Sequence, residues 1–142
     1  MEQTKQLNRF VDAQKIHYDI ALSEIRQGRK VSHWMWFIFP QLKGLGKSAS
    51  ATYYGIDGFA EARAYYEDAL LGARLIEICN ALLAHTDKTA VQIFGSVDAK
   101  KLRSCMTLFH AVDPECEVFE QILKQFYCGK EDYRTLAMLK EW

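Results

Sequence analysis

Apolar residues recur at intervals of three and four along nearly the whole chain, which is the spacing of one face of a helix. The first such stripe predicts a long helix that ends at Gly28, and its members are Leu7, Phe10, Val11, Ile20, Ala21 and Ile25. Similar stripes mark residues 71–82, 98–112 and 118–126. No segment alternates apolar and polar residues between hairpin turns, as a half-buried strand would. The pattern therefore predicts an all-α fold, a single compact domain over residues 1–142 with about seven or eight helices.

Local signals predict where some of these helices begin and end. Ser32 is a predicted N-cap of a short helix that Pro40 ends, because proline lacks the backbone donor that a helix interior needs. The alternative for this stretch is an extended strand over residues 34–39, which are rich in aromatic side chains. Asp113 followed by Pro114 predicts a helix start with proline at the first helical position.

The segment Ser32–Gln41 is strongly aromatic and runs into a basic, glycine-rich loop. Six consecutive residues within it, 34–39, contain two of the three tryptophans and two of the eight phenylalanines. Aromatic rings beside cationic and backbone donors suit a ligand with a flat face and a charged end. A domain core with a sharp exit turn would use the same residues, since tryptophan and phenylalanine are usually buried.

The loop at residues 44–48, Gly-Leu-Gly-Lys-Ser, looks like the end of a nucleotide-binding P-loop. The complete pattern needs a further glycine where this chain has Gln41, so NTP hydrolysis of that type is excluded. Gly44 and Gly46 still let the backbone approach an anion, and Ser48 is a predicted N-cap of a helix whose free N–H groups favour negative charge. An anion site and a plain loop with an N-cap both fit this pattern.

A line of polar residues follows the apolar stripe of a later predicted helix. Arg103, Thr107 and His110 share this line at i, i+4 and i+7, with Lys101 and Ser104 beside it. Such a line either forms a pocket wall or faces water.

The composition is that of an ordinary globular domain, with 142 residues of which 49% are hydrophobic and 25% charged. Eighteen Lys and Arg balance eighteen Asp and Glu, so no duplex nucleic acid is expected as a partner. The charge is uneven, because residues 24–50 hold five cations and one acid. That patch suits either an anionic small molecule or a solvated basic face.

Residue spacings argue against several other classes of protein. The four cysteines form no Cys-x-x-Cys pair and residues 1–6 lack the apolar core of a signal peptide, which predicts reduced thiols and a cytoplasmic location. The longest apolar run, residues 34–39, is far shorter than the roughly 18 residues that suggest a membrane span, so no membrane association is expected. The four histidines show no metal-ligand spacing, and we expect neither a metal nor a cofactor.

Several motifs, in order along the chain, match one family. They are Ser32-His33-Trp34-Met35-Trp36-Phe37-Ile38-Phe39-Pro40-Gln41, Tyr53-Tyr54-Gly55-Ile56, Glu61-Ala62-Arg63-Ala64-Tyr65, Leu71-Gly72-Ala73-Arg74-Leu75 and Lys101-Leu102-Arg103-Ser104-Cys105-Met106-Thr107-Leu108-Phe109. On these motifs the chain closely resembles domain-of-unknown-function family 1810, whose members are small, single-domain and bacterial. The resemblance implies a mainly helical fold and brings no established activity. The label calpastatin, which some members carry, does not fit, because nothing here looks like that disordered inhibitor.

A fainter similarity is to the NAD/ADP-ribose-associated superfamily, in which an aromatic-Gly turn precedes a helix as Phe94-Gly95 does here. That group is linked to ADP-ribose metabolism and N-glycosidic hydrolysis, so the similarity implies a nucleotide-like ligand. The motifs do not match residue by residue, and no catalytic role is carried over.

These observations lead to one main hypothesis, a cytoplasmic protein that binds or processes a small, anionic, nucleotide-like ligand of ADP-ribose or NAD type. As an enzyme it would be a hydrolase. The candidate catalytic residues are His33 and Lys101, and His33 is the first choice because histidine exchanges protons near neutral pH. The candidate ligand-binding residues are Trp34, Trp36, Gln41, Gly44, Gly46, Lys47, Ser48, Tyr54, Ser104 and Thr107.

In this hypothesis Trp34 or Trp36 stacks on a ring of the ligand, while Lys47 and Ser48 hold a phosphate. The alternative is an interaction module, in which exposed aromatic residues form a surface for a partner or a homodimer. Single-stranded nucleic acid stacked on the same residues is disfavoured by the neutral net charge.

Overall fold

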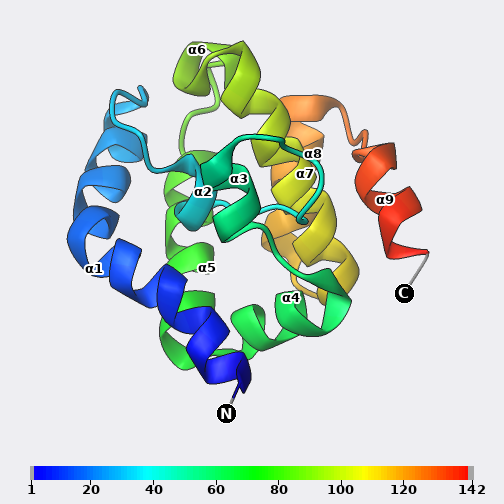
Figure 1. Cartoon of the computed structure of the whole chain (residues 1–142). Helices are drawn as coiled ribbons and strands as arrows, with labels where there is room; N and C mark the ends of the chain where they lie inside the picture. Colours follow the sequence, from blue (N-terminus) through cyan, green and yellow to red (C-terminus); the bar gives the residue numbers. More distant parts are fainter. Residues whose placement is uncertain (1, 141–142) are drawn as a thin grey trace.

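The computed structural model describes the backbone of residues 2–140 and the side chains of residues 7–140, so residues 1, 141 and 142 of the predicted domain lie outside the described part. The nine helices of the described part are α1 (Glu2–Gln27), α2 (Met35–Ile38), α3 (Ala49–Tyr54), α4 (Gly58–Glu67), α5 (Ala69–Leu83), α6 (Ala90–Phe94), α7 (Ser96–Val112), α8 (Glu117–Tyr127) and α9 (Tyr133–Leu139). Residues 2–140 contain no strand, and Leu42 and Ile56 form an isolated parallel bridge. The predicted all-α fold is confirmed, and the aromatic stretch that could have been a strand contains α2 (Figure 1).

Helix α7 runs through the core. It contacts α4, α6, α8 and α9, while α5 contacts α1, α4 and α8. The apolar stripe of α7 is fully buried at Leu102, Cys105, Met106 and Phe109. In Figure 1, α1 and α9 lie at opposite sides of the molecule, and the short helices α2 and α3 lie between α1 and α7. The start of α7, at residues 100–104, borders the segment after α2 and the start of α9.

Two of the predicted helix starts are wrong, and in each case a polar side chain has another use. Helix α2 begins at Met35 rather than after Ser32, because the Ser32 hydroxyl donates to the Glu24 carboxylate at 2.6 Å. Helix α8 begins at Glu117, and the Asp113 carboxylate accepts the backbone N–H of Glu115 at 3.1 Å, in the turn before the helix, and the Tyr66 hydroxyl at 2.8 Å.

Helices α4 and α5 meet at a sharp corner that depends on a glycine. Asp68 ends α4 and caps α5 by accepting hydrogen bonds from the backbone N–H groups of Leu70 and Leu71. A Cβ atom at Gly72 would lie 2.1 Å from the carbonyl oxygen of Tyr66. The first turn of α5 can therefore approach the end of α4 only because residue 72 has no side chain.

The segment between α3 and α4 is tied to α1 by a buried ion pair. The Arg9 guanidinium donates to both carboxylate oxygens of Glu61, at 2.8 and 3.3 Å. It also donates to the carbonyl oxygens of Tyr53 and Gly55, at 2.8 and 2.9 Å. Glu61 in turn accepts the backbone N–H of Asp57 at 2.9 Å. Because Gly55 and Tyr54 border the site described next, this ion pair fixes one of its walls.

Candidate functional site

A cleft with a volume of about 240 Å³ lies between the loop after α2, the first half of α7 and the start of α9. Its lining is Gln41, Leu45, Lys100, Lys101, Arg103, Ser104, Asp132 and Arg134. Four of these side chains are cationic and one is a carboxylate, so the cleft concentrates positive charge in a protein whose net charge is zero.

Most of this charge is not neutralised by protein carboxylates. Lys100 and Arg134 are exposed and form no ion pair with any residue in the described part of the chain. Arg103 donates to two backbone carbonyl oxygens, those of Lys130 and Glu131, at 3.0 and 2.9 Å. Carbonyl groups carry no net charge, so the guanidinium keeps its field in the cleft.

Lys101 and Asp132 are the two charged lining residues with carboxylate or capping partners. The Lys101 ammonium lies 3.4 Å from the Asp98 carboxylate, which also pairs with Lys30 at 2.9 Å. The Asp132 carboxylate caps α9 by accepting from both the backbone N–H and the hydroxyl of Thr135, at 2.9 and 2.6 Å. A carboxylate used in this way holds the start of α9 in place.

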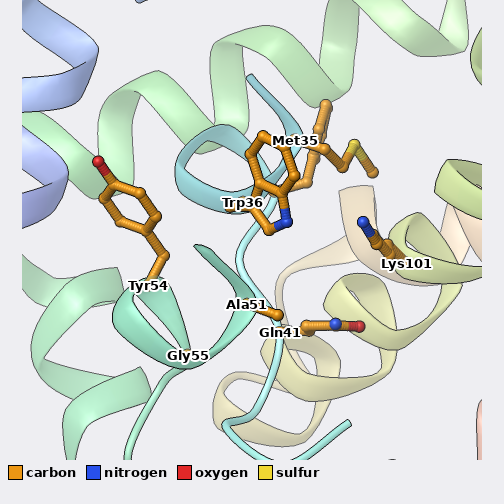
Figure 2. Close-up of a pocket in the computed structure, with 8 residues that line it drawn as sticks. Met35, Trp36, Gln41, Ala51, Tyr54, Gly55 and Lys101 are labelled. Carbon is orange, nitrogen blue, oxygen red and sulfur yellow. The ribbon is translucent and has the colours of Figure 1, made fainter. Parts of the chain in front are cut away.

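A second, smaller cavity adjoins the cleft and is called the inner pocket below. Its volume of about 10 Å³ accommodates a single water-sized group. The inner pocket and the cleft share Gln41 and Lys101, which therefore form the boundary between them (Figure 2). The rest of the inner pocket is lined by Met35, Trp36, Phe39, Ala51, Tyr54 and Gly55.

Trp36 brings an unused hydrogen-bond donor to the inner pocket. Its indole Nε1 is buried and has no hydrogen-bond partner in the described residues. In Figure 2 this nitrogen faces the space that Lys101 and Gln41 border. The Lys101 ammonium also lies 5.1 Å from the centre of the indole ring, a favourable cation–π contact. A buried donor without an acceptor is costly, at about 1–3 kcal/mol, and marks this pocket as a place for an acceptor atom.

The structure brings five of the predicted site residues together. Trp36, Tyr54, Gln41 and Lys101 line the inner pocket, and Ser104 lines the cleft with Gln41 and Lys101. Tyr54 contributes its ring, since its hydroxyl points away from Trp36 and Lys101 (Figure 2).

Trp34 does not belong to this group, which corrects the prediction that its ring could stack on a ligand. The side chain has an exposed fraction of 0% and packs against the rings of Phe39 and Phe94. Its indole N–H donates to the Glu24 carboxylate at 2.9 Å. Trp34 is a core residue, and no face of it is open to a ligand.

The other predicted residues near the loop also lie outside both cavities. His33 is exposed and lines neither cavity, so the geometry gives it no substrate to protonate. Lys47 and Ser48 are exposed as well, and the Ser48 hydroxyl caps α3 by accepting the backbone N–H of Ala51 at 3.1 Å. The N-cap prediction is confirmed, and the phosphate role predicted for these two residues has no cavity to support it.

The two glycines of the loop have a structural role. Gly44 has a φ of 102°, and a Cβ atom there would lie 3.3 Å from the Cε of Met138 in α9. A Cβ atom at Gly46 would lie 2.7 Å from the Cβ of Ala51. Both positions let the loop pass close to its neighbours, and neither residue is among those that line the cleft.

Thr107 is buried and has a structural role rather than the predicted role in binding. Its hydroxyl donates to the carbonyl oxygen of Arg103 and accepts the backbone N–H of Asp132, each at 2.8 Å. His110, one turn further along α7, lies 3.8 Å from the Glu131 carboxylate. The polar line of Arg103, Thr107 and His110 therefore fastens residues 130–132 to α7, which places Arg134 at the cleft.

Glu24 organises the approach to α2 and makes stability depend on pH. Burial alone would raise the pKa of its carboxyl group, but hydrogen bonds from Ser32, Val31 and Trp34 outweigh it and lower the pKa to about 2. A group with a lowered pKa in the folded state stabilises the fold above its unfolded pKa, and that contribution is lost as the pH falls.

We therefore expect the free energy of unfolding to fall between about pH 4.5 and pH 2. The Glu24→Gln variant is expected to be less stable at pH 7 and to lose less stability over this interval. Urea unfolding at several pH values measures both. Equal losses in the wild type and in Glu24→Gln would show that Glu24 is not the group responsible.

No helix among residues 2–140 is both long enough and apolar enough to cross a membrane. No group of three or more His, Cys, Asp or Glu side chains is placed to hold a metal ion in the same residues. The lining residues that the sequence did not single out are Leu45, Lys100, Asp132 and Arg134.

The fold and the cleft define a small helical domain with a cationic site between α2, α7 and α9. The chain belongs to the family described as "Protein of unknown function (DUF1810)", whose pattern matches residues 4–139. This confirms the predicted family. The crystal structure of the conserved hypothetical protein Rv1873 from Mycobacterium tuberculosis is similar, with a TM-score of 0.93 and 45% sequence identity, over 94% of this chain and 96% of that chain. No curated protein matches the sequence.

Proposed function

We propose that this protein binds a small, anionic, nucleotide-like molecule in the cleft between α2, α7 and α9. The observation that carries the proposal is the set of lining cations without carboxylate partners, above all Lys100 and Arg134. Cations gathered in a concave site of low dielectric raise the local concentration of an anion and hold it more strongly than the same charges on an open surface.

The size of the cleft restricts the ligand. Its volume of about 240 Å³ is below the roughly 300–1,000 Å³ of pockets that enclose drug-sized molecules. A mononucleotide or a sugar phosphate suits this volume better than a whole dinucleotide. The proposal therefore keeps the nucleotide-like class expected from the sequence and places the phosphate beside α7 and α9 instead of the loop at residues 44–48.

The lining residues support binding more directly than hydrolysis. Asp132 is the carboxylate among them, and its Oδ2 atom is occupied by the cap of α9. Lys101 stays the candidate proton donor because it borders both cavities. Ligand binding requires the cations alone, and the hydrolase hypothesis stays a prediction.

A thermal-shift screen tests the proposal. The panel contains nucleoside monophosphates, sugar phosphates, NAD, ADP-ribose and the matching uncharged nucleosides. A ligand at one hundred times its Kd adds about 2.7 kcal/mol to the stability of the fold, which for a domain of this size is on the order of 5–10 °C in Tm. We expect such a rise with the phosphorylated compounds and none with the nucleosides.

A matched pair of variants connects the rise to the cleft. Replacing Lys100 and Arg134 together by alanine removes two exposed cations and is expected to abolish the rise while leaving the Tm of the free protein nearly unchanged. Arg29→Ala removes an exposed cation that does not line the cleft and should keep the rise. A rise that survives in the double variant, or a flat response of the wild type to every anion, would contradict the proposal.

The interaction-module alternative stays a prediction, and Tyr53 and Tyr133 are the exposed aromatic residues that it could use. Trp34 is buried, and Trp36 lies behind Lys101 at the inner pocket. The half-buried Trp36 is therefore the tryptophan nearer to a partner surface, and sedimentation at high concentration tests for a homodimer.

A further inference from the structure

We infer that the ligand is a phosphate monoester and that one of its terminal oxygens accepts the indole N–H of Trp36 in the inner pocket. This inference rests on the proposed function and narrows it. The proposed function needs only an anion in the cleft, whereas the inference also fixes the chemical class of the anionic group and the atom that it meets.

The first argument is the position of the unused donor. The Nε1 atom of Trp36 is buried without a partner, and it faces the boundary formed by Lys101 and Gln41 (Figure 2). Lys101 supplies an ammonium and Gln41 an amide at the same boundary. An indole N–H, an ammonium and an amide N–H are all hydrogen-bond donors, so three side chains that can donate border the place where the cleft meets the inner pocket. An oxyanion at this boundary would accept from all three.

The second argument is the shape of the inner pocket. About 10 Å³ is enough for one oxygen-sized group. Apart from the Trp36 nitrogen and the two boundary residues, the pocket is lined by apolar side chains, aromatic rings and the backbone of Gly55. The chain of a ligand cannot continue through it. The group at the boundary is therefore the end of the ligand, with one oxygen inward and its ester bond leading back into the cleft.

The third argument is charge. A phosphate monoester carries about 1.5–2 negative charges near pH 7 and three terminal oxygens. A diester or a carboxylate carries one charge and offers two such oxygens. Lys100, Lys101, Arg103 and Arg134 line the cleft with the single carboxylate of Asp132, and of these cations Lys101 is paired with a carboxylate outside the lining, that of Asp98. The more highly charged monoester gains more from this surplus. It also offers an oxygen for the Trp36 donor while two others face the cations.

The experiment follows the tryptophan indole signals of ¹⁵N-labelled protein by NMR. The chain has three tryptophans, Trp34, Trp36 and Trp142, and the Trp36→Phe variant identifies the Trp36 signal. Adenosine 5′-monophosphate, adenosine 3′,5′-cyclic monophosphate, adenosine and inorganic phosphate are titrated in turn. These compounds separate the monoester from the diester, from the base alone and from free phosphate.

We expect the monoester to move the Trp36 indole signal and to leave that of Trp34, which already donates to Glu24. The cyclic diester should bind at least tenfold more weakly than the monoester, and inorganic phosphate should move the same signal at higher concentration. Trp36→Phe keeps an apolar ring and removes the donor, so it should lower the affinity for the monoester about tenfold and change that for the cyclic diester little.

The outcomes separate the inference from the proposed function. If the monoester binds and the Trp36 signal does not move, or if the cyclic diester binds equally well, the inference is overturned and the cleft remains an anion site. If no anion binds to the wild type, both fail.

Discussion

Replacing Glu61 by alanine is expected to destabilise the fold by about 3–5 kcal/mol, the effect of removing one partner of a buried ion pair. The exposed fractions of the Arg9 and Glu61 side chains are 12% and 4%. Without Glu61, the Arg9 guanidinium loses the carboxylate that accepts two of its hydrogen bonds, and the backbone N–H of Asp57 loses its acceptor. Urea unfolding monitored by circular dichroism measures the change in the free energy of unfolding.

The same helix offers a matched control for this prediction. Glu67 is an exposed glutamate of α4, and Glu67→Ala is expected to change stability by less than about 0.5 kcal/mol. Glu61→Gln keeps the size of the side chain and removes its charge, so it should fall between the two. A Glu61→Ala variant as stable as Glu67→Ala would mean that the ion pair does not hold the α3–α4 segment.

Replacing Trp34 by alanine is expected to destabilise the fold by about 3–5 kcal/mol, as for other large buried aromatic residues. The substitution leaves a cavity beside Phe39 and Phe94. It also removes the indole N–H that donates a hydrogen bond to the Glu24 carboxylate. Tyr133→Ala is the control, since its aromatic side chain is 77% exposed and should matter by less than about 0.5 kcal/mol.

This prediction also separates a structural role from a role in binding. If Trp34 were a stacking platform for a ligand, its replacement would lower affinity and leave the stability of the free protein nearly unchanged. We expect instead that the replacement strongly lowers the stability of the free protein, which urea unfolding measures. Unchanged stability together with lost ligand affinity would restore Trp34 to the site.

Much of the fold follows from the sequence because its causes are local. The periodic apolar positions of α5 and α7 face the core, as predicted, and Leu75, Ile78, Leu102 and Phe109 are fully or almost fully buried. Helix starts are predicted less well where a side chain finds a distant partner. The Ser32 hydroxyl bonds to Glu24, eight residues away, and no local rule for N-caps anticipates that contact.

The site was harder to predict because it is assembled from three separate segments. Trp36, Gln41 and Lys101 could be selected from the sequence, since an aromatic cluster and a cationic helix face are visible there. Arg134 reaches the cleft only because α7 fastens residues 130–132, through Arg103 and Thr107. The Gly-Lys-Ser pattern suggested a phosphate site. In the structure Ser48 caps a helix of six residues, and Lys47 lines neither the cleft nor the inner pocket.

The central claim is that the cationic cleft holds a small phosphorylated anion, and isothermal titration calorimetry tests it most directly. Adenosine 5′-monophosphate is titrated into the wild type and into Arg134→Glu, which reverses one exposed charge of the cleft. The account predicts saturable binding of one ligand per chain that weakens as salt is added and falls at least tenfold in Arg134→Glu. Binding of equal strength in the two proteins, or none in the wild type, would contradict it.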